Sequence, residues 1–262
     1  MAEKLVPTLF GISMYPTVSL DSEELINQYL DVFESDEKFV PIEWGDSELI
    51  KLDYCRTEAI KRVSDGKVSE LYLHRNKSIK YTGYVDVQAD PRSYLSLKFD
   101  KTMSRKYWSQ FFELSNQLAN IVRPRFGSTH IFWPAKYPWN NERERDLVWM
   151  NISAQPIPVR FLPNGPLGLG MRTYFGGHVL EMLGRDFLKR TPAIVTELEW
   201  GGICIDLLEE PWEADVEEVL DIWLKVMDYF CSSKAFAIPS FDEDRMGVSF
   251  SPNQAWEDYL KS

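Results

Sequence analysis

Apolar and polar residues alternate with different periods along the chain, and each period indicates a different kind of element. From Glu70 to Phe99 apolar residues recur at every second position in LYLHR, KYTGYVDVQ and YLSLKFD, with short polar turns between these runs. Successive side chains of a strand point to opposite faces, so this pattern predicts an antiparallel meander with one buried face. Tyr94, Ser96 and Lys98 form the polar set of the last strand. Another strand is expected from Thr8 to Tyr15.

Helical spacing appears in three segments. Apolar residues from Trp108 to Val122 recur at three and four residues and predict a long helix from about Ser104 to Val122. A second helix is expected in the first third of the chain, where Asp21 and Glu24 stand at capping-box spacing. The third is ADVEEVLDIWLKVMDYF, whose predicted apolar stripe is Val216, Leu220, Trp223, Leu224, Met227 and Cys231.

The remaining segments are shorter. STHIFW and QPIPVRFL are predicted strands, HVLEMLGRDFL a short helix, and AIVTELEWGGICIDLL two strands or one strand bent at Gly201 and Gly202. AKYPWNNERERDLVW is expected to be a surface loop with a turn or two of helix. With no internal repeat, the chain is predicted to form a single α+β domain over residues 1–262. Its antiparallel sheet meander packs against amphipathic helices, and an arrangement in two lobes stays open.

Composition places the chain among packed globular proteins. Apolar residues make up 44% of it, and it holds nine Trp, which is enough to build a large core. No run of eighteen apolar residues and no secretory signal pattern is seen, so we expect a cytoplasmic protein that does not enter a membrane. Its three cysteines are widely spaced, and we expect Cys55, Cys204 and Cys231 to be buried small hydrophobic residues.

The negative charge is concentrated in one segment. The chain has 40 acidic and 29 basic residues, and ten of the acidic ones lie between Thr191 and Leu224, where there is no Lys or Arg. The remainder therefore holds 30 acidic and 29 basic residues and is nearly neutral. An acidic segment of this kind argues against direct binding of nucleic acid and favours a basic partner.

Part of this acidic segment has a local explanation, because carboxylates stabilise the first turn of a helix. That effect does not account for Glu209 and Glu210, which precede the predicted helix. Natural surfaces intersperse the two signs of charge, so an uncompensated excess indicates a docking surface. Trp223 and Trp200 are expected in the core, which leaves Trp212 as the aromatic anchor. The predicted partner-binding residues are Glu197, Glu199, Glu209, Glu210, Trp212, Glu213, Asp215, Glu217, Glu218 and Asp221.

The sequence matches none of the familiar catalytic motifs. The glycines in GPLGLGMRTYFGG lack the spacing of a phosphate-binding loop, and His74, His130 and His178 are too isolated to predict a metal site. We therefore expect no catalytic residues, no metal and no cofactor. One alternative is a metal-dependent hydrolase, because Glu197 and Glu199 would share one face of a strand. An adaptor or chaperone that carries an effector without inhibiting it is the other.

Three short runs carry a family resemblance: RTYFGG from Arg172, ELEWGG from Glu197, and LLEEPW before the acidic helix. With them the chain resembles the immunity protein 52 family of bacterial polymorphic-toxin and type VI secretion systems. The resemblance implies a cytoplasmic antitoxin that binds and neutralises a cognate secreted toxin, with a nuclease as the expected toxin. It implies no contact residues, so the predicted interface depends on the charge pattern.

Overall fold

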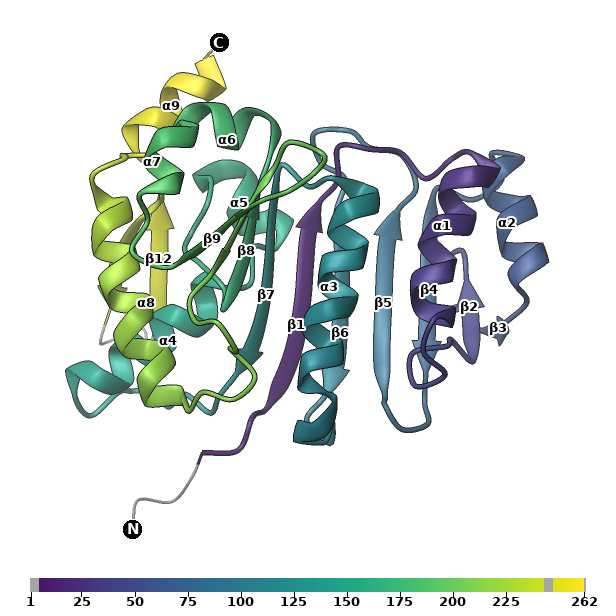
Figure 1. The fold of residues 1–262 in the computed structure, drawn as a ribbon, viewed down its shortest axis with the longest axis horizontal. Coiled ribbons are helices and arrows are strands. Elements are labelled where there is room, and N and C mark those ends of the chain that lie inside the picture. The colour runs from purple at the N-terminus through teal and green to yellow at the C-terminus, as the bar shows by residue number, and fades with distance from the viewer. Residues whose placement is uncertain (1–4, 243–246, 262) are drawn as a thin grey trace.

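The computed structural model describes residues 5–242 and 247–261, which form an α+β fold around one ten-stranded antiparallel sheet (Figure 1). The strand order is β3-β2-β4-β5-β6-β1-β7-β8-β10-β9, and a separate hairpin joins β11 to β12. The strands of the large sheet are β1 Leu9–Tyr15, β2 Glu43–Gly45, β3 Leu52–Asp53, β4 Glu70–Arg75, β5 Tyr81–Asp86, β6 Leu95–Asp100, β7 Phe126–Phe132, β8 Arg172–Phe175, β9 Ile194–Glu197 and β10 Ile203–Asp206. The small hairpin consists of β11 Ile238–Asp242 and β12 Gly247–Ser251.

The helices fill the connections between these strands. A 3-10 turn at Arg105–Tyr107 leads directly into α3. The α-helices are α1 Glu23–Glu34, α2 Arg56–Ser64, α3 Trp108–Val122, α4 Glu142–Ser153, α5 Pro158–Asn164, α6 Gly177–Leu183, α7 Arg185–Lys189, α8 Val216–Cys231 and α9 Gln254–Lys261. The expected α+β class, the meander β4-β5-β6 and the long helix α3 are therefore confirmed.

Strand β1 lies in the middle of the sheet although it comes first in the chain. It pairs with β6 on one side and β7 on the other, so that Gly11 stands opposite both Lys98 and His130. Its inward side chains, Phe10 and Ile12 among them, are fully buried. β1 therefore joins the meander to the C-terminal part of the chain in one continuous sheet.

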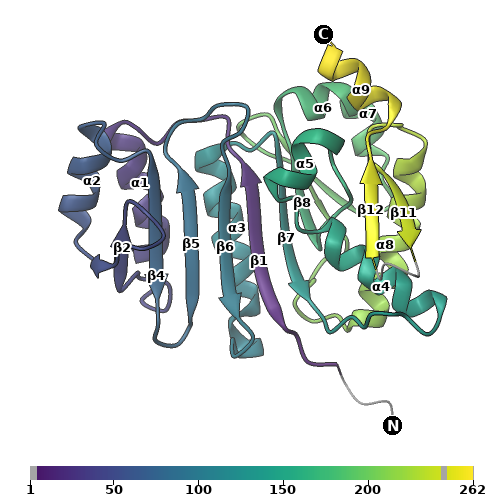
Figure 2. The ribbon, with the colours of Figure 1, turned by 180° about the vertical axis from the view of Figure 1, so that it is seen from behind.

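The two faces of the sheet are covered unequally. On one face α1 and α3 lie across β4, β5, β6 and β1, and the apolar stripe of α3 packs into the core (Figure 1). On the opposite face, a row of aromatic side chains receives the C-terminal helices. Tyr15 and Phe126 stack on Phe161 of α5, and Phe175 stacks on Phe230 of α8. Over β4, β5 and β6 no helix of the described residues lies in front of this second face (Figure 2).

Of two predictions about the middle of the chain, one is confirmed in part and one is wrong. The segment expected to be a surface loop with a turn or two of helix is a loop up to Asn141, but its helix, α4, continues beyond it to a length of twelve residues. The Asn141 side chain accepts a hydrogen bond from the Glu144 amide at the start of this helix. The first turns of α4 are highly charged, so the sequence pattern resembles a surface loop. The buried apolar residues, Leu147 and Val148 among them, come only in the second half of the helix. The expected strand QPIPVRFL is instead the helix α5. Proline at the first turn of a helix costs no hydrogen bond, whereas in a strand it removes one.

Smaller differences follow from local geometry. The N-cap of α1 is Ser22 and not Asp21, because the Ser22 hydroxyl accepts the Leu25 amide at 3.2 Å. The expected helix HVLEMLGRDFL is divided into α6 and α7 at Gly184, whose φ of 81° suits glycine. Cys204 is buried as expected, but Cys55 and Cys231 are exposed. Cys231 ends α8, beyond the part of that helix that packs into the core.

Candidate partner-binding surface

The acidic segment begins with the hairpin β9–β10 and continues into α8. Gly201 has a φ of 90°, and the turn around it reverses the chain as predicted for the two glycines. Asp215 is the N-cap of α8, and its carboxylate accepts the Glu218 amide at 3.0 Å. Glu217 and Glu218 occupy the first turn, where carboxylates favour the positive end of the helix. Local helix chemistry therefore accounts for these three carboxylates.

Basic residues from other parts of the chain neutralise some of this segment. Arg143 of α4 forms ion pairs with Glu217 at 2.7 Å and Asp221 at 2.8 Å. Arg105, just before α3, pairs with Glu213 at 3.3 Å. The expectation of an uncompensated charge is therefore wrong for these three carboxylates. The sequence could not show this, because the arginines lie more than seventy positions away and only the fold brings them close.

Glu197 is also paired, and Glu199 is not beside it on a strand. Glu197 contacts Lys189 at 2.6 Å and Arg185 at 3.8 Å, and the hydrogen bond from Lys189 holds the pKa of its carboxyl below the usual value. β9 ends at Glu197, so Glu199 lies in the following turn. The shared strand face that would have supported a paired-carboxylate hydrolase is absent. In the described residues no group of three or more His, Cys, Asp or Glu is placed to hold a metal ion.

A smaller set of carboxylates stays exposed. Glu209, Glu210 and Glu218 are exposed and form no ion pair with any residue that the structure describes. Glu209 and Glu210 lie in the loop before α8, and Glu218 lies in the first turn of that helix. We use the name acidic surface for Glu209, Glu210, Glu213, Asp215, Glu217, Glu218 and Asp221.

The three tryptophans of the segment have different surroundings. Trp223 is fully buried, as expected, and its indole donates a hydrogen bond to the Leu169 carbonyl at 2.8 Å. Trp200 was expected on a strand but lies in the β9–β10 turn, where its ring covers Gly202. Trp212 is half-buried, with its ring centroid 5.8 Å from that of Phe112. Trp212 thus offers one side to solvent while the other anchors the loop to α3.

The histidines have no metal-site geometry. His74 and His130 are buried and His178 is half-buried. Burial lowers the pKa of His74, and it lowers the pKa of His130 to about 3 and that of His178 to about 4. Removal from water disfavours the charged imidazolium, so all three are neutral at physiological pH.

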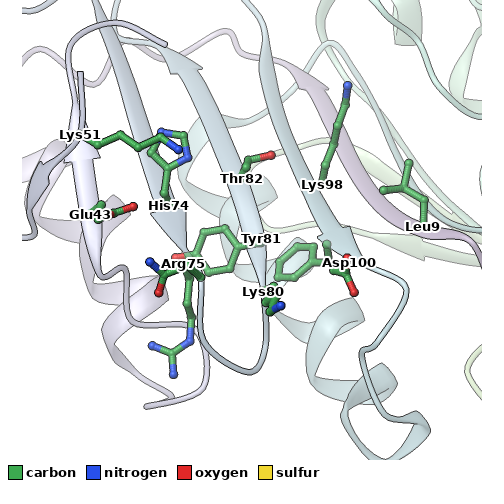
Figure 3. A pocket seen from close by; sticks show the side chains of 12 residues that line it. Leu9, Glu43, Lys51, His74, Arg75, Lys80, Tyr81, Thr82, Lys98 and Asp100 are labelled. Atoms are coloured by element: carbon green, nitrogen blue, oxygen red, sulfur yellow. The ribbon is translucent and has the colours of Figure 1, made fainter. Parts of the chain in front are cut away.

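The structure also contains a surface hollow that the sequence did not predict. The outward side chains of β4, β5 and β6 form the floor of a hollow of about 500 Å³. It lies next to a second hollow of about 390 Å³, whose lining side chains are drawn in Figure 3. The β2–β3 connection borders the larger hollow on one side and Ile157, just before α5, on the other. We call this hollow the trough, and it is lined centrally by Lys51, Tyr72, His74, Thr82, Tyr84 and Lys98.

The alternation in β4, β5 and β6 did signal a polar face. Tyr72 and His74, Thr82 and Tyr84, and Ser96 and Lys98 occupy every second position. The sequence could not show that this face would stay uncovered, because the helices that cover the rest of it come from distant segments.

Comparison with known proteins establishes the fold. No known protein-family pattern and no curated protein matches the sequence. Among solved structures the chain is similar to the Pseudomonas aeruginosa T6SS protein PA0821, with a TM-score of 0.56 and 14% sequence identity. The match covers 98% of this chain and 82% of the other. In the described residues no helix is long and apolar enough to cross a membrane.

Proposed function

We propose that this chain is an immunity protein that binds and neutralises a cognate secreted toxin, with a nuclease as the expected toxin. Two independent likenesses support this proposal. The runs RTYFGG, ELEWGG and LLEEPW resemble the immunity protein 52 family, and the fold is similar to that of a protein described as a T6SS protein. Both associate the chain with secretion systems that deliver toxins.

The observation that carries the mechanism is the acidic surface. After internal pairing is taken into account, Glu209, Glu210 and Glu218 still have no cationic partner in the described residues. A nuclease must present basic side chains to the phosphates of its substrate. Exposed carboxylates on a rigid helix and its preceding loop can occupy such a groove by imitating that charge. Trp212, with one side open to solvent, adds an aromatic contact next to them.

Electrostatic attraction also explains how a small amount of toxin could be captured quickly. Opposite charges on two surfaces raise the rate of association, and this effect declines as salt screens the charges. Inhibition by occupation of the groove needs no catalytic residue, so the proposed protein acts by binding alone.

The test is co-expression with the toxin encoded beside this gene. We expect cells that make both proteins to survive, and the purified proteins to bind with an affinity that falls as salt rises. In the variant Glu209→Lys, Glu210→Lys, Glu218→Lys, we expect affinity to fall at least about tenfold and the salt dependence to flatten. The matched control carries the same charge change at exposed positions elsewhere, namely Asp53→Lys, Glu181→Lys and Asp186→Lys.

Three results would contradict the proposal at different points. Death of cells that produce both proteins would refute neutralisation. Binding without loss of toxin activity would identify an adaptor or chaperone. Equal affinity of the acidic-surface variant and its control would show that the interface lies elsewhere on an immunity protein.

A further inference from the structure

The acidic surface has exposed carboxylates without a cationic partner in the described residues. The trough instead has hydrogen-bond donors without a partner there. Two carboxylates near it have partners: Tyr72 donates to Glu70 at 2.9 Å, and Tyr84 donates to Asp86 at 2.5 Å. A third carboxylate, Glu48, lines the trough at its β2–β3 border, on the same connection as Lys51. Lys98, in contrast, has no ion pair among the residues described. The cross-strand neighbours of Lys98 are Thr82 and Gly11, neither of which carries a charge. Glu48 can balance Lys51 at the border, so the surplus of donors lies at Lys98 and Thr82 in the middle of the trough.

A buried histidine beside these donors adds one unused N–H donor and one unused acceptor nitrogen. His74 is 7% exposed, and neither ring nitrogen has a hydrogen-bond partner in the described structure. It lies in the same cross-strand row as Thr82 and Lys98, and Figure 3 shows it beside Lys51. A neutral imidazole keeps one N–H donor, and a buried polar atom without a partner costs free energy. Glu43 stands opposite His74 at the outer end of the row, so the donor surplus is centred on Thr82 and Lys98.

Aromatic and apolar groups surround these donors. The rings of Tyr72 and Tyr84 lie 5.1 Å apart and are partly exposed. On the β2–β3 connection that borders the trough, Leu49 is 94% exposed and Ile50 42% exposed. Tyrosine floors and apolar rims are typical of protein-binding surfaces, where they contribute contact area around a central polar group.

We propose that the trough is a second docking surface, which binds an acidic segment of a protein partner. A carboxylate of the segment accepts hydrogen bonds from Lys98 and Thr82, and a neighbouring apolar side chain packs on Tyr72 and Tyr84. The proposal rests on the donor surplus and goes beyond the proposed function, because it requires a partner of opposite charge from the one that the acidic surface would bind. It stands whether or not the chain neutralises a toxin.

The test selects peptides from a phage-displayed library of random dodecapeptides on the full-length protein, and measures the best binder by calorimetry. We expect selected peptides to be enriched in Asp or Glu next to an aromatic or aliphatic residue. Lys98→Glu should weaken binding at least about tenfold, and replacing the peptide carboxylate with Lys should restore binding to that variant. The matched control is Lys61→Glu, an exposed lysine on α2 outside the trough, which should leave affinity within about twofold.

Thr82→Asp provides a second variant, and thermal unfolding shows whether each variant is folded. Amide resonances of β4, β5 and β6 should shift on peptide binding, while those of α8 should not. The proposal would be overturned if no peptide were selected, if the selected peptides lacked acidic residues, or if they bound folded Lys98→Glu as tightly as the original protein.

Discussion

The ion pair between Arg172 and Asp206 should be the most sensitive charged contact in the fold. These residues stand opposite each other on β8 and β10, and the guanidinium donates two hydrogen bonds to the carboxylate, at 2.6 Å and 3.1 Å. Its third nitrogen donates to the carbonyl of Phe112 on α3 at 2.9 Å. The two side chains are 14% and 12% exposed, so solvent screens them weakly. Together they attach α3 to the sheet at Phe112, the residue on which Trp212 packs.

Asp206→Asn should destabilise the protein much more than a surface substitution. Removing one partner of a buried pair leaves the other charge without compensation, which costs roughly 3–5 kcal/mol. For a chain of this length that loss lowers the melting temperature by roughly 2 °C or more per kcal/mol, or about 6–10 °C in all. Urea unfolding followed by circular dichroism, together with a thermal scan, measures both quantities.

A double variant separates the pair from its individual side chains. Arg172→Met with Asp206→Leu removes both charges and keeps apolar volume, so it should be less destabilised than Asp206→Asn alone. The matched surface control is Lys67→Ala. It removes the exposed ion pair between Lys67 and Asp65, which lie 2.8 Å apart, and this loss should cost under about 1 kcal/mol. The reasoning fails if Asp206→Asn costs less than about 1 kcal/mol. It also fails if the double variant loses as much stability as the single variants Arg172→Met and Asp206→Leu lose together.

Three further outcomes follow from the described contacts. Burial lowers the pKa of His130 to about 3. In the unfolded chain histidine titrates at about 6.5, so as pH falls the unfolded chain takes up the proton first. Stability should therefore be full above pH 6.5 and fall at lower pH, by up to about 1.4 kcal/mol per unit, and His130→Gln should flatten that slope in urea titrations. Gly202→Ala should lower the melting temperature by several degrees, because its Cβ would stand 2.0 Å from the ring of Trp200; an unchanged melting temperature would contradict the described packing. Arg143→Ala should cost under about 1 kcal/mol, since its ion pairs are half-exposed, yet it should steepen the salt dependence of toxin binding by releasing Glu217.

Local patterns predicted the elements whose signal lies within a single segment. The stripe from Trp108 to Val122 contains its own period, and the meander needs only short turns to bring its strands together. Helix α5 was predicted to be a strand because proline can stand either at the edge of a strand or in the first turn of a helix. The sequence does not show which residue begins the first turn. Pattern alone assigns an element most securely where the chain pairs with its immediate neighbours.

Contacts between distant segments could not be predicted in this way. Nothing near Leu9–Tyr15 indicates that β1 will insert between β6 and β7, and nothing near Glu217 indicates that Arg143 will pair with it. The acidic segment was therefore identified correctly as a concentration of charge but overestimated as free charge. The trough was missed for the same reason, because an uncovered face is defined by where distant helices do not pack.

The positions of the two surfaces have a consequence for binding. Glu213 of the acidic surface pairs with Arg105, just ahead of α3, and α3 covers one face of the sheet. Lys98 alternates along β6 with the core residues Leu97 and Phe99, so it and the rest of the trough lie on the opposite face. Partners on the two surfaces would thus be separated by the sheet itself and need not compete for space. The acidic surface suits a basic partner and the trough an acidic one. A charge reversal on either surface should therefore weaken binding of the partner at that surface and leave the affinity of the other surface for its partner unchanged.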